Sequence, residues 1–267
     1  MMSTPKLTLL NVTHFLFKPS QFYAVNEIAD AAQYADFFEQ DQLTTMNCAH
    51  IAASGMSMLV DASNEHIDPT SPTAQQGVPQ PPSLLSQLAA MGIEPSDITH
   101  VVITHPHDDH ISGLSHEVDG QLRPIFYTAK HYLGQADWES AAVQNSLRDP
   151  STVVAQALLP IQQAGLLVLV NGDLDFGNGV QIIATPGETP GHQAVRVQSE
   201  HDITYLVGDL FHFPIEFKHL DWLVRWKDRP SALASRKKMM QALQNEQAHL
   251  IATHIGEVVS YQQKETI

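Results

Sequence analysis

The sequence is poor in cysteine, in basic residues and in long apolar runs, and each shortage excludes a class of protein. Cys48 is the only cysteine among 267 residues, so the chain forms neither an intrachain disulfide nor a zinc site built on several cysteines. Lys and Arg number 14 against 29 Asp and Glu, and a formal charge of −15 repels a nucleic-acid backbone. Apolar runs such as Leu166 to Val170 are far shorter than the roughly 20 residues that span a bilayer.

The first residues do not have the pattern of an export signal. Met1 to Phe17 carry Lys6, Asn11 and His14 inside their apolar stretch and show no small-residue cleavage site. We therefore expect a cytoplasmic protein that acts on a small molecule, without nucleic-acid or membrane partners. The one dense basic stretch, Arg236 to Lys238, is expected to be the solvated face of a helix.

Short β-branched runs alternate with helical patterns, which predicts an α/β fold. The runs have strand length and end near Gly, Asp, Asn or His; they are 58–60, 101–104, 166–170, 180–184, 194–197, 203–207 and 250–252. Some follow one another as hairpins, with a turn at 200–202, and others are separated by helical patterns. Mixed sheets covered by helices are therefore expected.

Three helices are predicted from apolar spacing and from their end signals. Two run from Leu84 to Met91 and from Val153 to Ile161, and each stops before a glycine. The third passes through Met239, Met240 and Leu243, with Ser231 as its N-cap. A further stretch, Gln21 to Gln40, has rough helical spacing and is expected to be a helix that packs on the body of the protein, or one that covers the cleft.

The segment 66–83 holds five prolines and cannot form a regular element. It predicts a long surface loop, which is either a tolerated insertion or a lid over the substrate site. No linker divides the chain, so residues 1–267 are expected to form a single domain.

The strongest chemical signal lies directly after the run 101–103. His105, His107, Asp109 and His110 place three imidazoles and a carboxylate within six residues. Residues two apart on an extended chain point the same way, so His105 and His107 can bind one ion, while the following turn directs Asp109 and His110 at a neighbouring position. Such a ligand set suits zinc, manganese or iron and needs no thiolate.

Three more candidate ligands stand at the ends of strand-like runs. His192 follows the tight turn Thr189-Pro190-Gly191, Asp209 follows 205–208, and His254 follows 250–253. Each alone is weak evidence, but together with the first motif they indicate a metal site.

In this order the motifs resemble the metallo-β-lactamase-fold superfamily of metal-dependent hydrolases, over about residues 50–256. The resemblance implies a four-layer αβ/βα sandwich of two mixed β-sheets flanked by helices. It also implies two divalent metal ions, zinc first and manganese or iron as alternatives. One ion is held by His105, His107 and His192, the other by Asp109, His110 and His254, with Asp209 bridging them. Asp61 matches the carboxylate that orients a ligand imidazole; the alternative is a surface Asp at a strand end.

The resemblance also implies a mechanism in which a hydroxide that bridges the metals attacks the substrate, while one ion polarises its carbonyl or phosphoryl oxygen. Asp109 is then the candidate for passing a proton to the leaving group. His212 stands where the best-known lactonase type has a tyrosine, and it can donate a similar hydrogen bond in the right tautomer.

Departures from individual families narrow the substrate class. The commonest secreted zinc β-lactamases have a cysteine ligand at the position of Asp209 in this chain, and diiron relatives usually have Glu at the position of His107. Hydroxyacylglutathione hydrolases add a helical domain after the last ligand, whereas few residues follow His254 here. A tRNA-processing nuclease would need a basic surface. The remaining resemblance is to N-acyl homoserine lactonases and methyl-parathion-hydrolase-like enzymes, which implies a small hydrophobic lactone, ester or phosphotriester.

Aromatic residues cluster after Asp209 and are candidates for the substrate pocket: Phe211, Phe213, Phe217, Trp222 and Trp226. They would hold an acyl or aryl group, but they suit a core or a homodimer contact equally well. A different class of function stays open, namely a non-hydrolytic metal protein such as a mono-iron persulfide-dioxygenase-like enzyme or a metal-dependent binding module.

Overall fold

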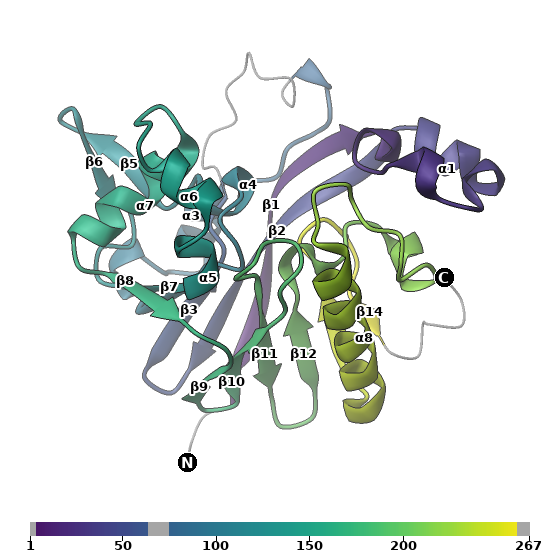
Figure 1. The fold of residues 1–267 in the computed structure, drawn as a ribbon. Helices are drawn as coiled ribbons and strands as arrows, with labels where there is room; N and C mark the ends of the chain where they lie inside the picture. Colours follow the sequence, from purple (N-terminus) through teal and green to yellow (C-terminus); the bar gives the residue numbers. More distant parts are fainter. Residues whose placement is uncertain (1–3, 64–74, 261–267) are drawn as a thin grey trace.

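A computed structural model describes residues 4–63 and 75–260 and shows two mixed six-stranded β-sheets packed face to face (Figure 1). The first sheet has the order β1 (Lys6–Phe17), β2 (Gln42–Ala53), β3 (Met56–Val60), β4 (His100–Val102), β7 (Lys130–Gly134) and β8 (Leu167–Val170). The second has the order β14 (Val259–Ser260), β13 (His249–Ile251), β12 (Ile203–Leu206), β11 (Gln193–Gln198), β10 (Val180–Ala184) and β9 (Leu174–Gly177). A separate hairpin joins β5 (Ser115–Val118) and β6 (Gln121–Pro124).

Helices cover the outer face of each sheet (Figure 1). The first sheet is covered by α3 (Leu84–Ala90), α4 (Asp108–Ile111), α5 (Gln135–Trp138), α6 (Ala141–Ser146) and α7 (Val153–Gln163), and the second by α8 (Arg229–Glu246). The chain also holds α1 (Ala35–Glu39) and 3-10 turns at Pro19–Gln21, Val25–Glu27, Ala31–Tyr34, Pro95–Asp97, Gly208–Leu210 and Pro214–Phe217. The four-layer arrangement expected from the resemblance is confirmed.

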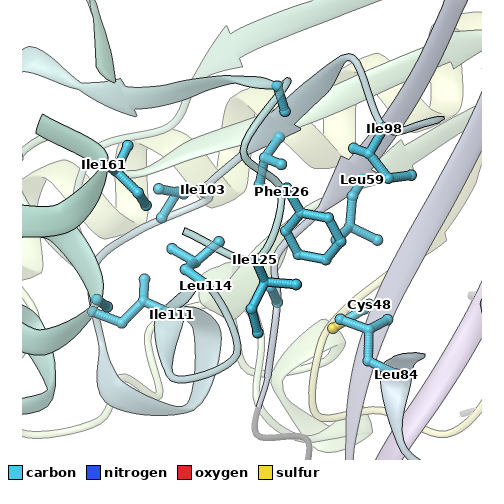
Figure 2. Packing of buried hydrophobic residues seen from close by; sticks show 14 of the residues in the cluster. Cys48, Leu59, Leu84, Ile98, Ile103, Ile111, Leu114, Ile125, Phe126 and Ile161 are labelled. Atoms are coloured by element: carbon cyan, nitrogen blue, oxygen red, sulfur yellow. The ribbon is translucent and has the colours of Figure 1, made fainter. Parts of the chain in front are cut away.

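Strands of the first sheet are apolar on both faces because both faces are covered. Cys48 and Leu59 point to the helices, where they join Phe126 and Ile161 in one cluster (Figure 2). Their neighbours Ala49 and Met58 point to the second sheet and join the core between the sheets. Side chains alternate along a strand, so a continuous apolar run supplies both cores.

Helix α8 covers the second sheet with Met239, Met240 and Leu243, as predicted. Its N-cap is Asp228, whose side chain accepts a hydrogen bond from the Ser231 backbone N–H at 3.1 Å. The expectation of Ser231 as the cap is therefore wrong by one turn, because the chain becomes helical before Pro230 rather than after it.

The predicted strands are all present within one or two residues, and so are the three predicted helices. The long antiparallel hairpin of β1 and β2 was not predicted, although it supplies two strands of 12 residues each. The predicted helix over Gln21 to Gln40 is wrong. This segment forms short 3-10 turns and α1, and its rings pack on Phe213 and Trp222.

The proline-rich segment 66–83 lies partly outside the described residues, so its role as a lid stays untested. Its described end lies along the edge strand β1. The Gln76 and Gln80 side chains each donate to and accept from the backbone of one β1 residue, Leu16 and His14 respectively, at 2.7–2.9 Å. Two glutamine side chains therefore satisfy an edge that would otherwise be free to pair with another strand.

Candidate metal centre

The candidate ligands gather at one edge of the sandwich. Strands β3 and β4 are parallel in the first sheet, and β12 and β13 are parallel in the second. The residues that follow their carboxyl ends include Asp61, His105, Asp209 and His254. Backbone hydrogen bonds join the two sheets here, from Gln193 N to Thr104 O at 2.9 Å and from Asn47 N to Thr253 O at 3.0 Å.

The first ligand group centres on His105 and His107. The His105 Nε2 atom lies 2.9 Å from His107 Nδ1 and 3.7 Å from Asp209 Oδ2. Glu188 joins them, and the ligand atoms of all four residues lie within 4.8 Å of one another. Sequence reasoning missed Glu188. The His192 ring lies 5.2 Å from that of His105, just outside this group.

The second group comprises Asp109, His110 and His254. The two imidazoles reach opposite oxygens of Asp209, with His110 Nε2 at 3.2 Å from Oδ1 and His254 Nε2 at 3.1 Å from Oδ2. Asp109 lies 3.4 Å from His254 and has a half-exposed side chain. Asp209 therefore contacts histidines of both groups.

The outer nitrogen of each of three histidines is held by a fixed acceptor. The Nδ1 atom of His110 donates to Asp61 Oδ2 at 2.8 Å, that of His192 to Thr185 O at 3.0 Å, and that of His254 to Thr45 O at 2.9 Å. Each Nε2 then faces inward. Such acceptors fix the orientation and the tautomer of metal-binding imidazoles.

Asp61 is buried rather than on the surface, so the surface alternative is wrong. Its backbone has a φ of +58°, and its carboxylate also accepts hydrogen bonds from the Thr104 N and Oγ1 atoms at 2.7 and 2.8 Å. The left-handed backbone turns the side chain back under the His110 ring. Few non-glycine residues adopt this conformation, and Asp is one that does.

The inward atoms fit a metal. His110 Nε2, His192 Nε2 and Asp209 Oδ1 are buried, and among residues 4–63 and 75–260 none makes a hydrogen bond of regular geometry, although His110 Nε2 and Asp209 Oδ1 face each other at 3.2 Å. Buried polar atoms without partners are costly unless something binds them. Nitrogen and carboxylate donors without thiolates suit zinc, manganese and iron.

The pKa shifts in the site show two kinds of histidine. Burial, and then the other imidazoles, hold the pKa of His105 well below its usual value, and burial lowers that of His192 to about 4. For His254, burial opposes charging, but Asp209 outweighs it and raises the pKa to about 9. Burial would raise the pKa of Asp209, but His254 and His110 lower it well below its usual value. The carboxylates thus require positive charge nearby, as protons or as cations.

Glycine 208 lets Asp209 come close to the histidines. Its φ is +52°, and a Cβ atom there would lie 2.8 Å from His192 Nε2 and 2.9 Å from the Thr104 side chain. Any larger residue would push the ligands apart. The Gly-Asp pair that ends the run 205–209 is therefore required by packing as well as by backbone conformation.

Two buried ion pairs support the site, and sequence reasoning missed both. Lys227 Nζ lies 3.0 Å from Glu188 Oε2, and Arg236 Nη2 lies 2.8 Å from Glu216 Oε2. The Arg236 side chain is fully buried, so its assignment to a solvated helix face is wrong; Lys237 and Lys238 are exposed as expected. No local pattern marks these pairs, because each joins residues far apart in the chain.

A cavity of about 890 Å³ opens onto the ligands. Its floor includes His107, Asp109, Asp209, His212 and His254. Five aromatic residues also line it, namely Phe15, Phe17, Phe22, Phe213 and Trp226, together with the apolar Ala142 and Val143 of α6 and Val154 of α7.

Of the five predicted pocket aromatics, Phe213 and Trp226 line this cavity, whereas Phe211, Phe217 and Trp222 do not. The Phe211 ring packs against Phe217 at 4.6 Å and under the Arg236 guanidinium. The Trp222 ring packs on Tyr34 at 4.9 Å. Phe15, Phe17 and Phe22 were missed because they come from the unpredicted N-terminal hairpin and the turn after it.

Comparison with known families agrees with this architecture. A family model described as the metallo-beta-lactamase superfamily matches residues 67–239. The chain belongs to this superfamily. Among residues 4–63 and 75–260, no helix combines the length and the apolar character needed to cross a membrane.

Curated members of the superfamily match less than half of this chain. An N-acyl homoserine lactonase from a Bacillus species is 27% identical over 117 residues, which cover 44% of this chain and 40% of the relative. Metallo-beta-lactamase domain-containing protein 1 from Xenopus laevis is 29% identical over 131 residues, 48% and 44% of the two chains. The matches thus span about two fifths of the length of these relatives.

Solved structures match over nearly the whole chain. A probable metal-dependent hydrolase from Staphylococcus aureus has a TM-score of 0.78 at 18% identity, covering 98% of this chain and 94% of that one. AidC, a dizinc quorum-quenching lactonase, has a TM-score of 0.73 at 20% identity, covering 96% and 89%. At these identities the likeness establishes the superfamily fold.

Proposed function

We propose that this protein is a dinuclear metal-dependent hydrolase that opens a small lactone or ester carrying an apolar acyl group. The superfamily, the lactonase relatives and the ligand clusters support metal-dependent hydrolysis. The substrate class goes beyond them and is argued from the cavity. A phosphotriester fits the same chemistry and belongs in the test.

The proposed ligand sets are those that the resemblance implies, and they differ from the first group at the sheet edge in having His192 instead of Glu188. His105, His107 and His192 would hold one ion, Asp109, His110 and His254 the other, and Asp209 would bridge them. Zinc is proposed first, because nitrogen and carboxylate donors suit it and redox chemistry is not needed. When bound, two such cations supply Lewis acidity and generate a nucleophile from water at neutral pH.

The residues around the proposed ions have separate tasks. Asp109 is half-exposed in the cavity floor and is proposed to pass a proton to the leaving group. His212 lies 3.3 Å from Asp209 through its Nε2 atom, and it is proposed to donate a hydrogen bond to the substrate. Asp61, through its bond to His110, keeps that imidazole oriented.

The cavity supports a substrate with a polar head and an apolar tail. Candidate ligands line part of it, and a row of rings in contact leads away from His254: Phe15 lies 5.7 Å from His254, Phe17 lies 4.5 Å from Phe15, and Phe22 lies 4.6 Å from Phe17. A metal-bound ester group on the floor would place an acyl chain against these rings. Apolar walls with few polar groups are typical of small-molecule sites.

The single observation that carries the proposal is that His107 of the first ligand group, and Asp109 and His254 of the second, line the same largely apolar cavity. Proton release by the zinc-loaded protein would be measured in a pH-stat with short and long acyl homoserine lactones, aryl esters and a phosphotriester. We expect rapid release from lactones, lost in Asp209→Ala together with bound zinc. The exposed Asp202→Ala is the matched control.

Two outcomes contradict the proposal. Turnover retained in a folded Asp209→Ala would exclude the bridging role. No release from any substrate, with iron absorbance and oxygen uptake, would favour the non-hydrolytic iron enzyme instead, whereas two equivalents of colourless zinc would count against that alternative.

A further inference from the structure

Lys227 is a buried cation at the back of the site. Its Nζ atom lies 2.6 Å from Asp209 O, 3.0 Å from Glu188 Oε2 and 3.3 Å from Leu210 O. It also lies 3.4 Å from Nδ1 of His212. The ammonium group thus contacts the backbone of one proposed metal ligand and the ring of the residue proposed to contact the substrate.

His212 stands between Lys227 and the cavity. Its Nδ1 atom faces the ammonium group, and its Nε2 atom faces Asp209 Oδ2 at 3.3 Å. The ring stacks on His254 at 5.5 Å, and the Trp226 ring meets it edge-on at 6.0 Å. These contacts restrict the plane of the imidazole, and the two polar contacts favour this orientation of its nitrogens.

An ammonium group has three protons and no lone pair, so it can only donate. These three protons serve four nearby acceptor atoms, and His212 Nδ1 is the farthest of them at 3.4 Å. A ring nitrogen that faces this cation is nevertheless favoured with its lone pair, not an N–H group, toward it. We infer that Lys227 fixes His212 in the tautomer that carries its proton on Nε2, so that the ring presents an N–H group to the cavity beside Asp209. Lys227 is then a positioning residue that acts through His212.

The tautomer decides what His212 can do. With its proton on Nε2, the ring donates toward Asp209 and toward an oxygen of a substrate on the cavity floor. With its proton on Nδ1, it would point that proton at a cation and a lone pair at a carboxylate, and both contacts would be repulsive. This use of the N–H group rests on the proposed hydrolase function, whereas the tautomer itself does not.

Glu188 holds Lys227 in place. Its carboxylate is fully buried, forms an ion pair with Lys227 through Oε2, and accepts a hydrogen bond from Trp226 Nε1 through Oε1. The pair therefore connects the loop before His192 to the segment that ends at α8. A buried ammonium group needs such a partner. Glu188 therefore fixes the position of the Lys227 ammonium group that faces His212.

The tautomer can be read directly from long-range ¹H–¹⁵N correlation spectra of the zinc-loaded protein labelled with ¹⁵N-histidine. The His212 signals are those that vanish in His212→Gln. We expect the pattern of a neutral ring protonated on Nε2. A ring protonated on Nδ1, or on both nitrogens, at pH 8 would overturn the inference, and this result requires no variant of Lys227.

Lys227→Met removes the donor, and Lys227→Arg keeps one. We expect Lys227→Met to lose the single Nε2–H pattern and to lower kcat by about 100-fold with KM changed less than about 2-fold, as when one transition-state donor is removed. Lys227→Arg should retain the pattern, and the exposed Lys237→Met should match the wild type. An unchanged tautomer in Lys227→Met would overturn the role of Lys227.

The proposed function can fail without this inference failing. If the wild-type protein hydrolyses none of the substrates but shows the Nε2–H ring, the proposed reaction is wrong and the tautomer assignment stands. If it hydrolyses lactones and His212 carries its proton on Nδ1, the assignment is wrong and the reaction stands.

Discussion

Two adjacent basic residues of α8, Arg236 and Lys237, differ in burial and in their partners. Arg236 is fully buried, whereas Lys237 is exposed. Arg236 donates to Leu210 O at 2.8 Å and pairs with Glu216, which in turn accepts from the His212 backbone N–H at 2.6 Å. The buried pair therefore connects α8 to the backbone that carries His212.

Replacing Arg236 by Met is expected to lower the free energy of unfolding by about 3–5 kcal/mol, because Glu216 would be left charged and unpaired in the interior. Urea denaturation measures this difference. The exposed Lys238→Met is the control and should stay within about 0.5 kcal/mol of the wild type. An equally small change in Arg236→Met would show that the pair adds little to stability.

At the scale of elements, the β1–β2 hairpin supplies a wall that the family match does not cover. The match begins at residue 67, whereas Phe15 and Phe17 lie on β1 and Phe22 follows it. The Phe17 and Phe22 rings are 4.6 Å apart, and Phe22 meets Trp226 at 5.4 Å. The hairpin is therefore the element expected to select the substrate's apolar part.

Phe17→Ala tests this role of the hairpin. Loss of the ring should raise KM for long-chain acyl lactones by about 5- to 30-fold, which corresponds to 1–2 kcal/mol of lost apolar contact. Short-chain lactones should change little, since they do not reach the ring. Leu43→Ala, on the exposed face of β2, is the control; an equal effect on both chain lengths would speak against a chain-length wall.

His131 on β7 makes the first sheet sensitive to acid. Burial lowers its pKa to about 4, while a contact with the Ala129 backbone opposes the shift. The unfolded chain takes up this proton near pH 6.5, so the folded state binds fewer protons between pH 6.5 and 4. The stability from the neutral ring is thus complete above pH 6.5 and is lost as the pH falls.

His131→Leu removes the group that must be protonated. The wild type should lose about 2 kcal/mol more of its free energy of unfolding than this variant when the pH is lowered from 8 to 5. Urea denaturation at both pH values measures this difference. Burial raises the pKa of Asp137 to about 6, so this carboxyl group stabilises the folded state as the pH falls. Because both proteins contain Asp137, its effect cancels in the comparison. The exposed His116→Leu should show no such pH-dependent difference from the wild type; a pH-independent difference for His131→Leu would contradict the assignment.

At the scale of the whole molecule, the site joins the two halves of the sandwich. His105 and His110 follow the first sheet, and Asp209 and His254 follow the second. The fold brings these side chains within a few ångströms of one another, since His105, His110 and His254 all lie 3.1–3.7 Å from Asp209. Any cation bound there would therefore link the two sheets and oppose their separation.

Zinc is expected to raise Tm by on the order of 10 °C at a free concentration about 1,000 times its Kd, because it binds the folded state alone. Differential scanning calorimetry with zinc, and with a chelator in parallel, measures the shift. Asp209→Ala should lose most of it. An undiminished shift in that variant would place the zinc elsewhere on the protein.

The candidate ligands and most of the fold could be predicted because their signals are local. The strands β3, β4, β12 and β13 are short apolar runs; β4, β12 and β13 are each followed by a candidate ligand within a few residues, and β3 is followed by Asp61. Parallel strands place such residues at one edge whatever the rest of the chain does. The hairpin β1–β2 was missed because Lys6, Asn11 and His14 interrupt its apolar pattern.

The sequence by itself determined the superfamily, the layers and the order of the candidate ligands, since each depends on residues adjacent in the chain. Tertiary structure alone decided the rest. It paired Glu188 with Lys227 and Glu216 with Arg236, and it placed the rings of β1 rather than Phe211 in the cavity wall. A charge or a ring takes its role from whichever distant segment the fold brings against it, because burial and pairing are properties of both partners.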